Sequence, residues 1–160
     1  MKQVRRQILI NSSVSIGYLF ASCPVLAQIS SDNTVGTQVN PSGSAGNIIY
    51  EITGGSQFGS NLFHSFREFS VPTGGEAFFK NTANLNNITN IINRVTGGSI
   101  SNIDGLIKEN YGANVILINP SGINFGANAQ LSIGGSFLAS TANSLKFADG
   151  AEFSATDYPC

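Results

Sequence analysis

The stretch "NPSGINFG", residues 119–126, combines turn-forming residues with one short apolar alternation. Asn119, followed directly by Pro120 and then by Gly122, is typical of a type I turn, because proline presets φ and glycine relieves the exit. The alternation Ile123-Asn124-Phe125 has the period of a short strand with one buried face. The stretch therefore predicts a corner, a strand and a second corner.

The same pattern returns when the chain is aligned with itself so that position 115 lies over position 137. Apolar positions then lie over apolar positions, and small turn-forming residues lie over one another. The matching segments are 115–117 with 137–139, 123–125 with 145–147, 126–128 with 148–150, and 129–133 with 151–155. Short strands that recur at this period are typical of a solenoid.

Each repeat is predicted to supply three strands, at residues 115–119, 123–125 and 129–133. One three-sided coil cannot bury its own inward side chains, so neighbouring coils have to cover them. The side chains expected to point inward are Val115, Leu117, Ile123, Phe125, Leu131 and Ile133. The sequence thus predicts an all-β fold, a parallel β-helix with about 22 residues per coil, a period within the range of solenoid repeats.

Upstream of residue 110 the repeat is less regular. Strands are predicted at 46–52, 77–81 and 91–96, and they are expected to form an N-terminal cap and the first coils. A cap is needed because an open coil exposes unpaired backbone groups. Residues 101–110, "SNIDGLIKEN", are compatible with a helical turn or with an irregular corner.

The segment 1–27 is typical of an export signal. Lys2, Arg5 and Arg6 form a cationic start, an apolar run follows over residues 8–21, and Ala27 ends a suitable signal-peptidase site. The run is too short and too polar to span a membrane, so no stable membrane insertion is expected. We expect the Sec machinery and signal peptidase to act on this segment, which leaves one domain at 28–160.

Two variants of the signal are weaker alternatives. The Arg5-Arg6 pair has a twin-arginine character, which would mean export in the folded state. The residues before Cys23 resemble a lipoprotein cleavage box, but Phe20 is a poor residue at its first position. Lipidation at Cys23 is therefore not expected.

The composition of the mature chain excludes several classes of function. Eight Lys and Arg less the three in the signal leave five, against nine Asp and Glu, so nucleic acid is not an expected partner. Cys160 is the single cysteine left after cleavage, and the sequence holds no Cys/His cluster, so no cofactor or metal is predicted. No polar capping segment follows the last repeat, from which we expect a C-terminally truncated domain: either the beginning of a longer protein or a truncated copy of one.

Three segments of the mature chain resemble the N-terminal secretion domain of two-partner-secretion exoproteins, the filamentous haemagglutinin family. They are "NLFHSFREFSV" at 61–71, "IINRVTGGSISNIDGLI" at 91–107, and "NVILINPSGINFG" at 114–126 followed by "IGGSFLAST" at 133–141. The resemblance implies a right-handed, single-stranded parallel β-helix with an N-terminal cap. It also implies a secreted or cell-surface protein without enzymatic activity, typically the N-terminus of a large adhesin.

In this family the unfolded chain is recognised in the periplasm by the POTRA domains of a dedicated outer-membrane β-barrel transporter. Carried over by resemblance, the recognition motif is Asn119, Pro120, Ser121, Gly122 and Ile123. A second family motif, Asn-Pro-Asn-Leu, is expected near residues 84–90, where this chain has "NLNNITN" without the proline. That difference leaves the choice of transporter open.

Other interpretations of the same residues compete with this one. The motif could be a plain solenoid corner, and His64, the only histidine, fits a packed residue of the cap better than a general base. An exported carbohydrate-active β-helix enzyme would need carboxylates that converge on one face, whereas Asp149, Glu152 and Asp157 do not stack in the repeat. A glycan-binding adhesin is a third class, but no residue here identifies a ligand.

Overall fold

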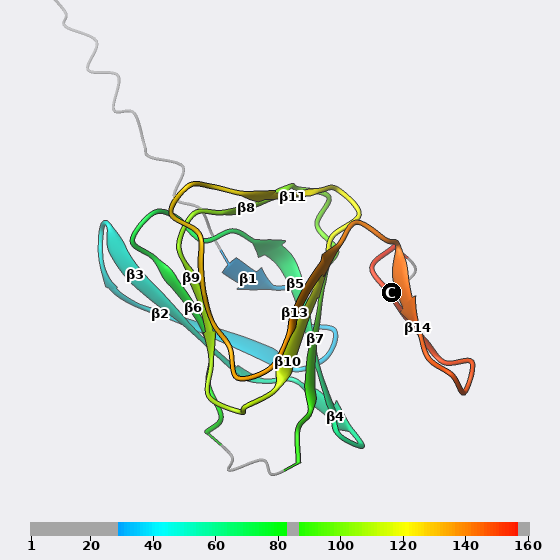
Figure 1. The fold of residues 1–160 in the computed structure, drawn as a ribbon. Helices are drawn as coiled ribbons and strands as arrows, with labels where there is room; N and C mark the ends of the chain where they lie inside the picture. Colours follow the sequence, from blue (N-terminus) through cyan, green and yellow to red (C-terminus); the bar gives the residue numbers. More distant parts are fainter. Residues whose placement is uncertain (1–28, 83–86, 157–160) are drawn as a thin grey trace, which may run out of the picture.

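The computed structural model describes residues 29–82 and 87–156. This part of the chain contains 15 strands and no helix. The predicted signal peptide, Cys23, Asp157 and Cys160 lie outside the described residues. The chain is all-β, as predicted, and most of its strands form three walls around a common interior (Figure 1).

The three walls are visited in turn by the chain. The first wall holds β1 (Ile29–Ser31), β4 (Ser56–Phe58), β5 (Asn61–Phe69), β7 (Asn90–Val95), β10 (Asn114–Ile118) and β13 (Phe137–Ser140). The second holds β2 (Thr37–Ser44), β3 (Asn47–Gly54), β6 (Glu76–Phe79), β9 (Leu106–Glu109) and β12 (Gln130–Ser132). The third pairs β8 (Ser101–Ile103) with β11 (Ile123–Phe125).

Strands from successive coils pair in parallel, which gives a β-helix-like arrangement. Val115 pairs with Phe137, and Ser101 pairs with Ile123, in each case at the offset that the sequence predicts. The spacing is wider in the early coils, where Val115 pairs with Ile91 on its other side. The predicted offset is thus confirmed for β10 with β13 and for β8 with β11, whereas β12 pairs with β9 at the wider spacing. The widening explains why the repeat is less regular upstream.

The N-terminal end of the described chain contains strands that pair antiparallel. β1 pairs antiparallel with β5, and β2 forms an antiparallel hairpin with β3. β3 then pairs in parallel with β6, so the second wall changes from antiparallel to parallel pairing at this strand. The strands predicted at 46–52, 77–81 and 91–96 correspond to β3, β6 and β7.

Residues 101–110 form neither a helical turn nor an irregular corner. They supply β8 and β9, and burial alternates along both strands, with Ser101, Ile103, Ile107 and Glu109 buried. The strands are joined by Asp104 and Gly105 alone, so each is too short to show a clear period in the sequence.

The predicted second copy of the repeat is wrong beyond residue 140. Residues 145–147 do not pair with 123–125, and 151–155 do not pair with 129–133. They form β14 (Ser144–Lys146) and β15 (Glu152–Ser154), which pair antiparallel with each other. The reason is the turn between them: Gly150 has φ +87° and its N–H donates to Phe147 O (3.0 Å), which reverses the chain.

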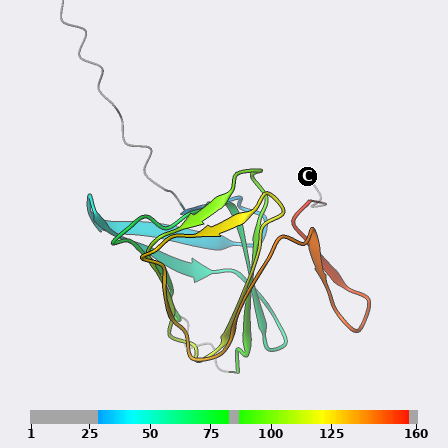
Figure 2. The ribbon, with the colours of Figure 1, turned by 45° about the horizontal axis from the view of Figure 1, so that its top comes forward.

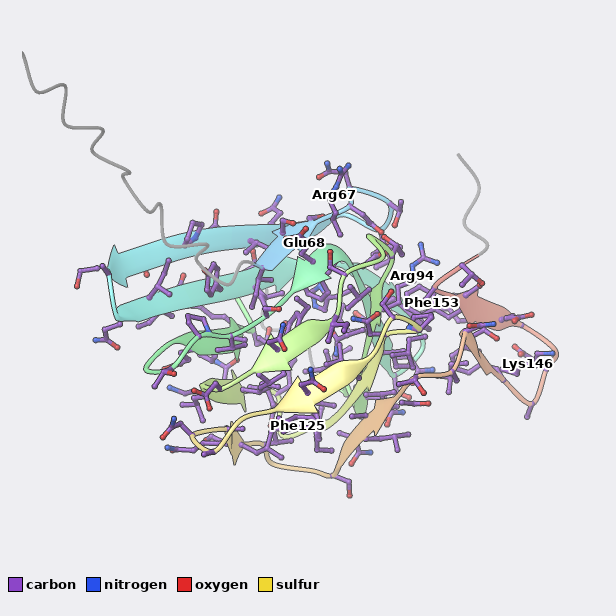
Figure 3. The ribbon with its side chains drawn as sticks, turned by 90° about the horizontal axis from the view of Figure 1, so that it is seen from above. Arg67, Glu68, Arg94, Phe125, Lys146 and Phe153 are labelled. Atoms are coloured by element: carbon purple, nitrogen blue, oxygen red, sulfur yellow. The ribbon has the colours of Figure 1, made fainter. Side chains whose placement is uncertain are left out.

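The β14–β15 hairpin packs against the outer surface of the first wall, apart from the interior (Figure 2). The Phe153 ring lies 4.9 Å from the Phe63 ring, and the Arg94 guanidinium lies 4.4 Å from the Phe153 centroid (Figure 3). Arg94 Nη1 also donates to Ser154 O at 2.5 Å. Aromatic packing and a cation–π contact therefore hold the hairpin in place.

The predicted inward side chains are fully buried only in the middle of the stack. Val115 and Leu117 are buried, as predicted, while Ile123 and Ile133 are partly buried. Phe125 and Leu131 remain 49% and 51% exposed. Among the described residues, no strand pairs with the outer edges of β11 and β12, so these two side chains are left partly uncovered on that side.

His64 is a packed residue of the early coils. Its ring is fully buried beside Phe66 and Phe79, and Nδ1 shares a hydrogen bond with Thr37 Oγ1 (3.2 Å). Its Nε2 has no hydrogen-bond partner among the described residues. Burial disfavours the charged imidazolium and lowers the pKa of His64 from 6.5 to about 4.

This shift predicts an acid-sensitive fold. The unfolded chain takes up a proton near pH 6.5, while the folded chain resists it down to about pH 4, so stability is lost as the pH falls through this window. Between pH 7 and pH 5 the loss from His64 should be about 2 kcal/mol. Urea unfolding at both pH values, compared with His64→Gln, measures it. An equal loss of stability in the variant would mean that other titratable groups cause the acid sensitivity.

Candidate recognition site

The predicted motif at 119–123 forms the corner between the first and third walls. Asn119 directly follows β10, and Ile123 begins β11. The N–H of Gly122 donates to Asn119 O at 3.0 Å, which is the i to i+3 bond of a β-turn. Pro120 and Ser121 occupy its central positions, and Gly122 has φ +121°, where a residue with a Cβ would be strained.

The Asn119 side chain is fully buried and all its hydrogen-bonding groups are used. Its Nδ2 donates to Ser99 O and to Ser101 Oγ, both at 2.9 Å. Its Oδ1 accepts a hydrogen bond from the N–H of Ser121 at 3.0 Å. The amide therefore fastens its own turn and ties that turn to the preceding coil.

Backbone bonds connect the same corner in both directions. The Asn119 N–H donates to Ser140 O on the following coil, and the Ser101 N–H donates to Gly122 O from the preceding one, each at 3.0 Å. Three successive coils are thus joined at this point. Loss of the corner would disturb strand pairing on both sides of it.

The five motif residues are not equally accessible. Ser121 is exposed, Pro120 and Gly122 are partly buried, and the Ile123 side chain packs against the interior cluster. A partner meeting the folded chain would therefore reach mainly Pro120 and Ser121. The site brought together by the fold is a structural corner with a small exposed tip.

The second motif, expected near residues 84–90, lies partly outside the described residues, which resume at Asn87. Within the described part, the Thr89 N–H donates to Ser60 O at 2.8 Å. Asn90 begins β7 and donates through Nδ2 to Asn61 Oδ1 at 2.9 Å. The end of this segment is thus also tied to the preceding coil.

An asparagine ladder runs along the first wall and was missed in the sequence. Asn114 Nδ2 donates to Asn90 Oδ1, and Asn90 Nδ2 donates to Asn61 Oδ1, both at 2.9 Å. Asn114 Oδ1 then accepts from the Ser136 N–H at 2.8 Å. Each of these asparagines stands directly before a run of apolar residues, and that recurrence is the signal that could have revealed the ladder.

A buried polar cluster on the outer face of the first wall was also missed in the sequence. Arg94 Nε donates to Ser65 Oγ (2.7 Å), and Ser65 Oγ donates to Asp32 (2.5 Å). Burial tends to raise the pKa of Asp32, but hydrogen bonds from Ser65, Thr34 and Thr96 outweigh it and hold that pKa below its ordinary value. Nothing in the sequence brings these distant residues together.

Of the acidic residues considered for catalysis, Asp149 and Glu152 both belong to the β14–β15 hairpin, and Asp157 lies outside the described residues. Asp149 Oδ1 accepts the Ala151 N–H within the hairpin turn (3.0 Å), and Glu152 is exposed opposite Lys146. Within residues 29–82 and 87–156, no three His, Cys, Asp or Glu side chains are grouped to hold a metal ion. The same residues include no helix that could cross a membrane.

The chain matches a model of a known protein family. The family model of the TPS secretion domain, where TPS stands for two-partner secretion, matches residues 27–159. The match covers the motif corner, the ladder and the β14–β15 hairpin. No curated protein matches the chain.

The geometry of the corner predicts a structural cost for Asn119→Ala. The change removes two donated and one accepted hydrogen bond and leaves buried groups unpaired, so unfolding free energy should fall by about 2 kcal/mol. Asn124→Ala is the matched control, because Asn124 is exposed and makes one side-chain bond, to Asn102 (3.2 Å). Urea unfolding of both variants measures the difference. Equal stability of the two would contradict the role of the corner.

Proposed function

The chain belongs to the family of TPS secretion domains, and from this membership we propose how it is exported. The Sec machinery and signal peptidase deliver the mature chain to the periplasm. The POTRA domains of a cognate outer-membrane β-barrel transporter bind it there while it is unfolded. The chain then threads through the barrel and folds at the cell surface or in the medium.

The burial of Asn119 is the observation that carries this proposal. In the folded chain both its amide donors and its acceptor are bonded to other residues of the protein. Its side chain is available to a transporter only before the corner forms. Recognition through Asn119 therefore has to precede folding, and folding withdraws this side chain once export is complete.

Folding outside the cell would also favour forward movement. Each coil that stacks buries apolar side chains such as Val115 and Leu117, and a large side chain contributes about 1.5–3 kcal/mol when fully buried. A folded coil is too wide to slip back through a pore that admits an extended chain. The same packing energy that stabilises the fold thus opposes its return.

We further propose that the β-helix is right-handed and single-stranded, with the antiparallel strands β1 and β2 in its N-terminal cap. The parallel pairing of β7, β10 and β13 supports this, because connections between parallel strands of one sheet are almost always right-handed. The domain is proposed to be non-catalytic and to form the N-terminal part of an adhesin. Its task is then to be exported and to start the coil.

Binding to purified POTRA domains tests the proposal. The mature chain, held unfolded in urea and diluted immediately before mixing, should bind the domains of a candidate transporter from the same genome. The chain allowed to fold first should not bind, because its Asn119 is then buried. Asn119→Ala should weaken binding of the unfolded chain about tenfold, a change of roughly 1.4 kcal/mol.

The matched control is again Asn124→Ala, which should bind like the unmodified chain. Stability does not enter this comparison, since all chains are presented unfolded. Equal binding by folded and unfolded chains would contradict recognition before folding. Equal binding by the two variants would remove Asn119 from the recognition motif.

A further inference from the structure

Two hairpins project from the outer surface of the first wall and leave a cleft between them. One is the β4–β5 hairpin and the other is the β14–β15 hairpin. The cleft has a volume of about 590 Å³, which is within the range of sites that hold a drug-sized ligand or several side chains. It lies on the outside of the coil, and none of its lining residues belongs to the Asn119 corner.

The walls of the cleft are aromatic. Phe58 and Phe63 come from the first hairpin, where the register Ser56↔Phe63 and Phe58↔Asn61 places both rings on one face. Phe147 and Phe153 come from the second, with ring centroids 5.9 and 4.9 Å from Phe63. These contacts close the base of the cleft and leave its mouth open.

Phe58 stands at the mouth and is unusually exposed. Its side chain is 76% exposed, whereas the other exposed large apolar residues of the described chain lie between 48% and 52%. Phe58 is grouped with Phe63, Phe147 and Phe153 around the cleft, and a contiguous apolar patch of this kind is typical of interaction sites. The cleft is therefore built to receive an apolar group.

The charges around the cleft restrict that group. Asp149 and Glu152 are among its lining residues, whereas Lys146, which stands opposite Glu152, is not, and none of the lining residues is basic. Arg94 lies behind Phe153 and is already engaged with Ser154 and Ser65. Anionic ligands such as phospholipid headgroups or nucleic acid are disfavoured, and a cationic group beside the apolar one is favoured.

The free edge of β4 favours a polypeptide over a small apolar molecule. β4 pairs only with β5, so within the described chain its other edge carries unpaired backbone groups next to Phe58. An extended peptide can bond to such an edge and place alternate side chains into a neighbouring pocket. An acyl chain or a sugar cannot do both.

We propose that this cleft docks an extended polypeptide segment that carries a bulky apolar side chain next to Lys or Arg. The apolar side chain enters between Phe58 and Phe153, and the cation lies near Asp149 and Glu152. The site exists only in the folded chain, because its two walls come from segments far apart in the sequence, 56–63 and 147–153. It is thus independent of transporter recognition, which acts on the unfolded chain.

A fluorescent peptide of sequence Gly-Lys-Val-Phe-Val-Arg-Gly is a suitable probe for anisotropy measurements on the folded chain. Phe58→Ser should weaken its binding about tenfold with little effect on folding, because the ring is already mostly exposed. The matched control is Phe125→Ser, the same substitution at a half-exposed ring on β11. Circular dichroism verifies that both variants are folded.

The peptide itself supplies the second comparison. Replacing its phenylalanine by serine should also reduce binding about tenfold. Replacing its Lys and Arg by Glu should reduce binding as well, and this loss should be larger at low salt than at high salt. Glu152→Gln should weaken binding of the cationic peptide and leave binding of an uncharged version of the peptide unchanged. Three results would each overturn the proposal. They are no binding, binding that Phe58→Ser leaves intact, and occupation of the cleft by a second copy of the chain in sedimentation experiments.

Discussion

The structure depends on the fact that no coil can be stable alone. Each of the later coils contributes only one short strand to a wall, and its inward side chains are covered only when the next coil stacks on it. Val115 is buried because β7 and β13 lie on either side of β10, whereas Phe125 and Leu131 are half exposed because no described strand stacks beyond them. The chain is therefore stabilised from neighbour to neighbour along its axis.

This constraint explains why polar side chains at the corners bond between coils. Asn119 reaches back to Ser99 and Ser101, and the ladder from Asn61 through Asn90 to Asn114 runs across three strands. Such bonds fix the register of one coil on the next, where apolar packing alone would tolerate sliding. A motif placed at a corner is consequently a structural element first, and the Asn119 side chain is accessible only before the chain folds.

The sequence predicted the coils that repeat, but it was misleading at the β14–β15 hairpin, whose residues resemble those of another coil. The offset between Val115 and Phe137 was correct because both stand in strands of one wall. The match at residues 148–150 was misleading, because the turn residues of a hairpin are the same types as those of a solenoid corner. For the site, the turn at Asn119 was predictable from Pro120 and Gly122, but the partners of its side chain were not, since they depend on the register of the stack.

The cluster around Arg94 was beyond sequence reasoning for a related reason. Its guanidinium bonds to Thr34 and to Ser154, each 60 residues away in opposite directions, and also to Ser65. A buried arginine is tolerated only when its donors are satisfied, so its burial requires the first described segment, the coils and the last hairpin together. Neighbour-to-neighbour stacking can proceed coil by coil, but this cluster is complete only when the β14–β15 hairpin has docked. The hairpin that breaks the repeat therefore joins the two ends of the described domain.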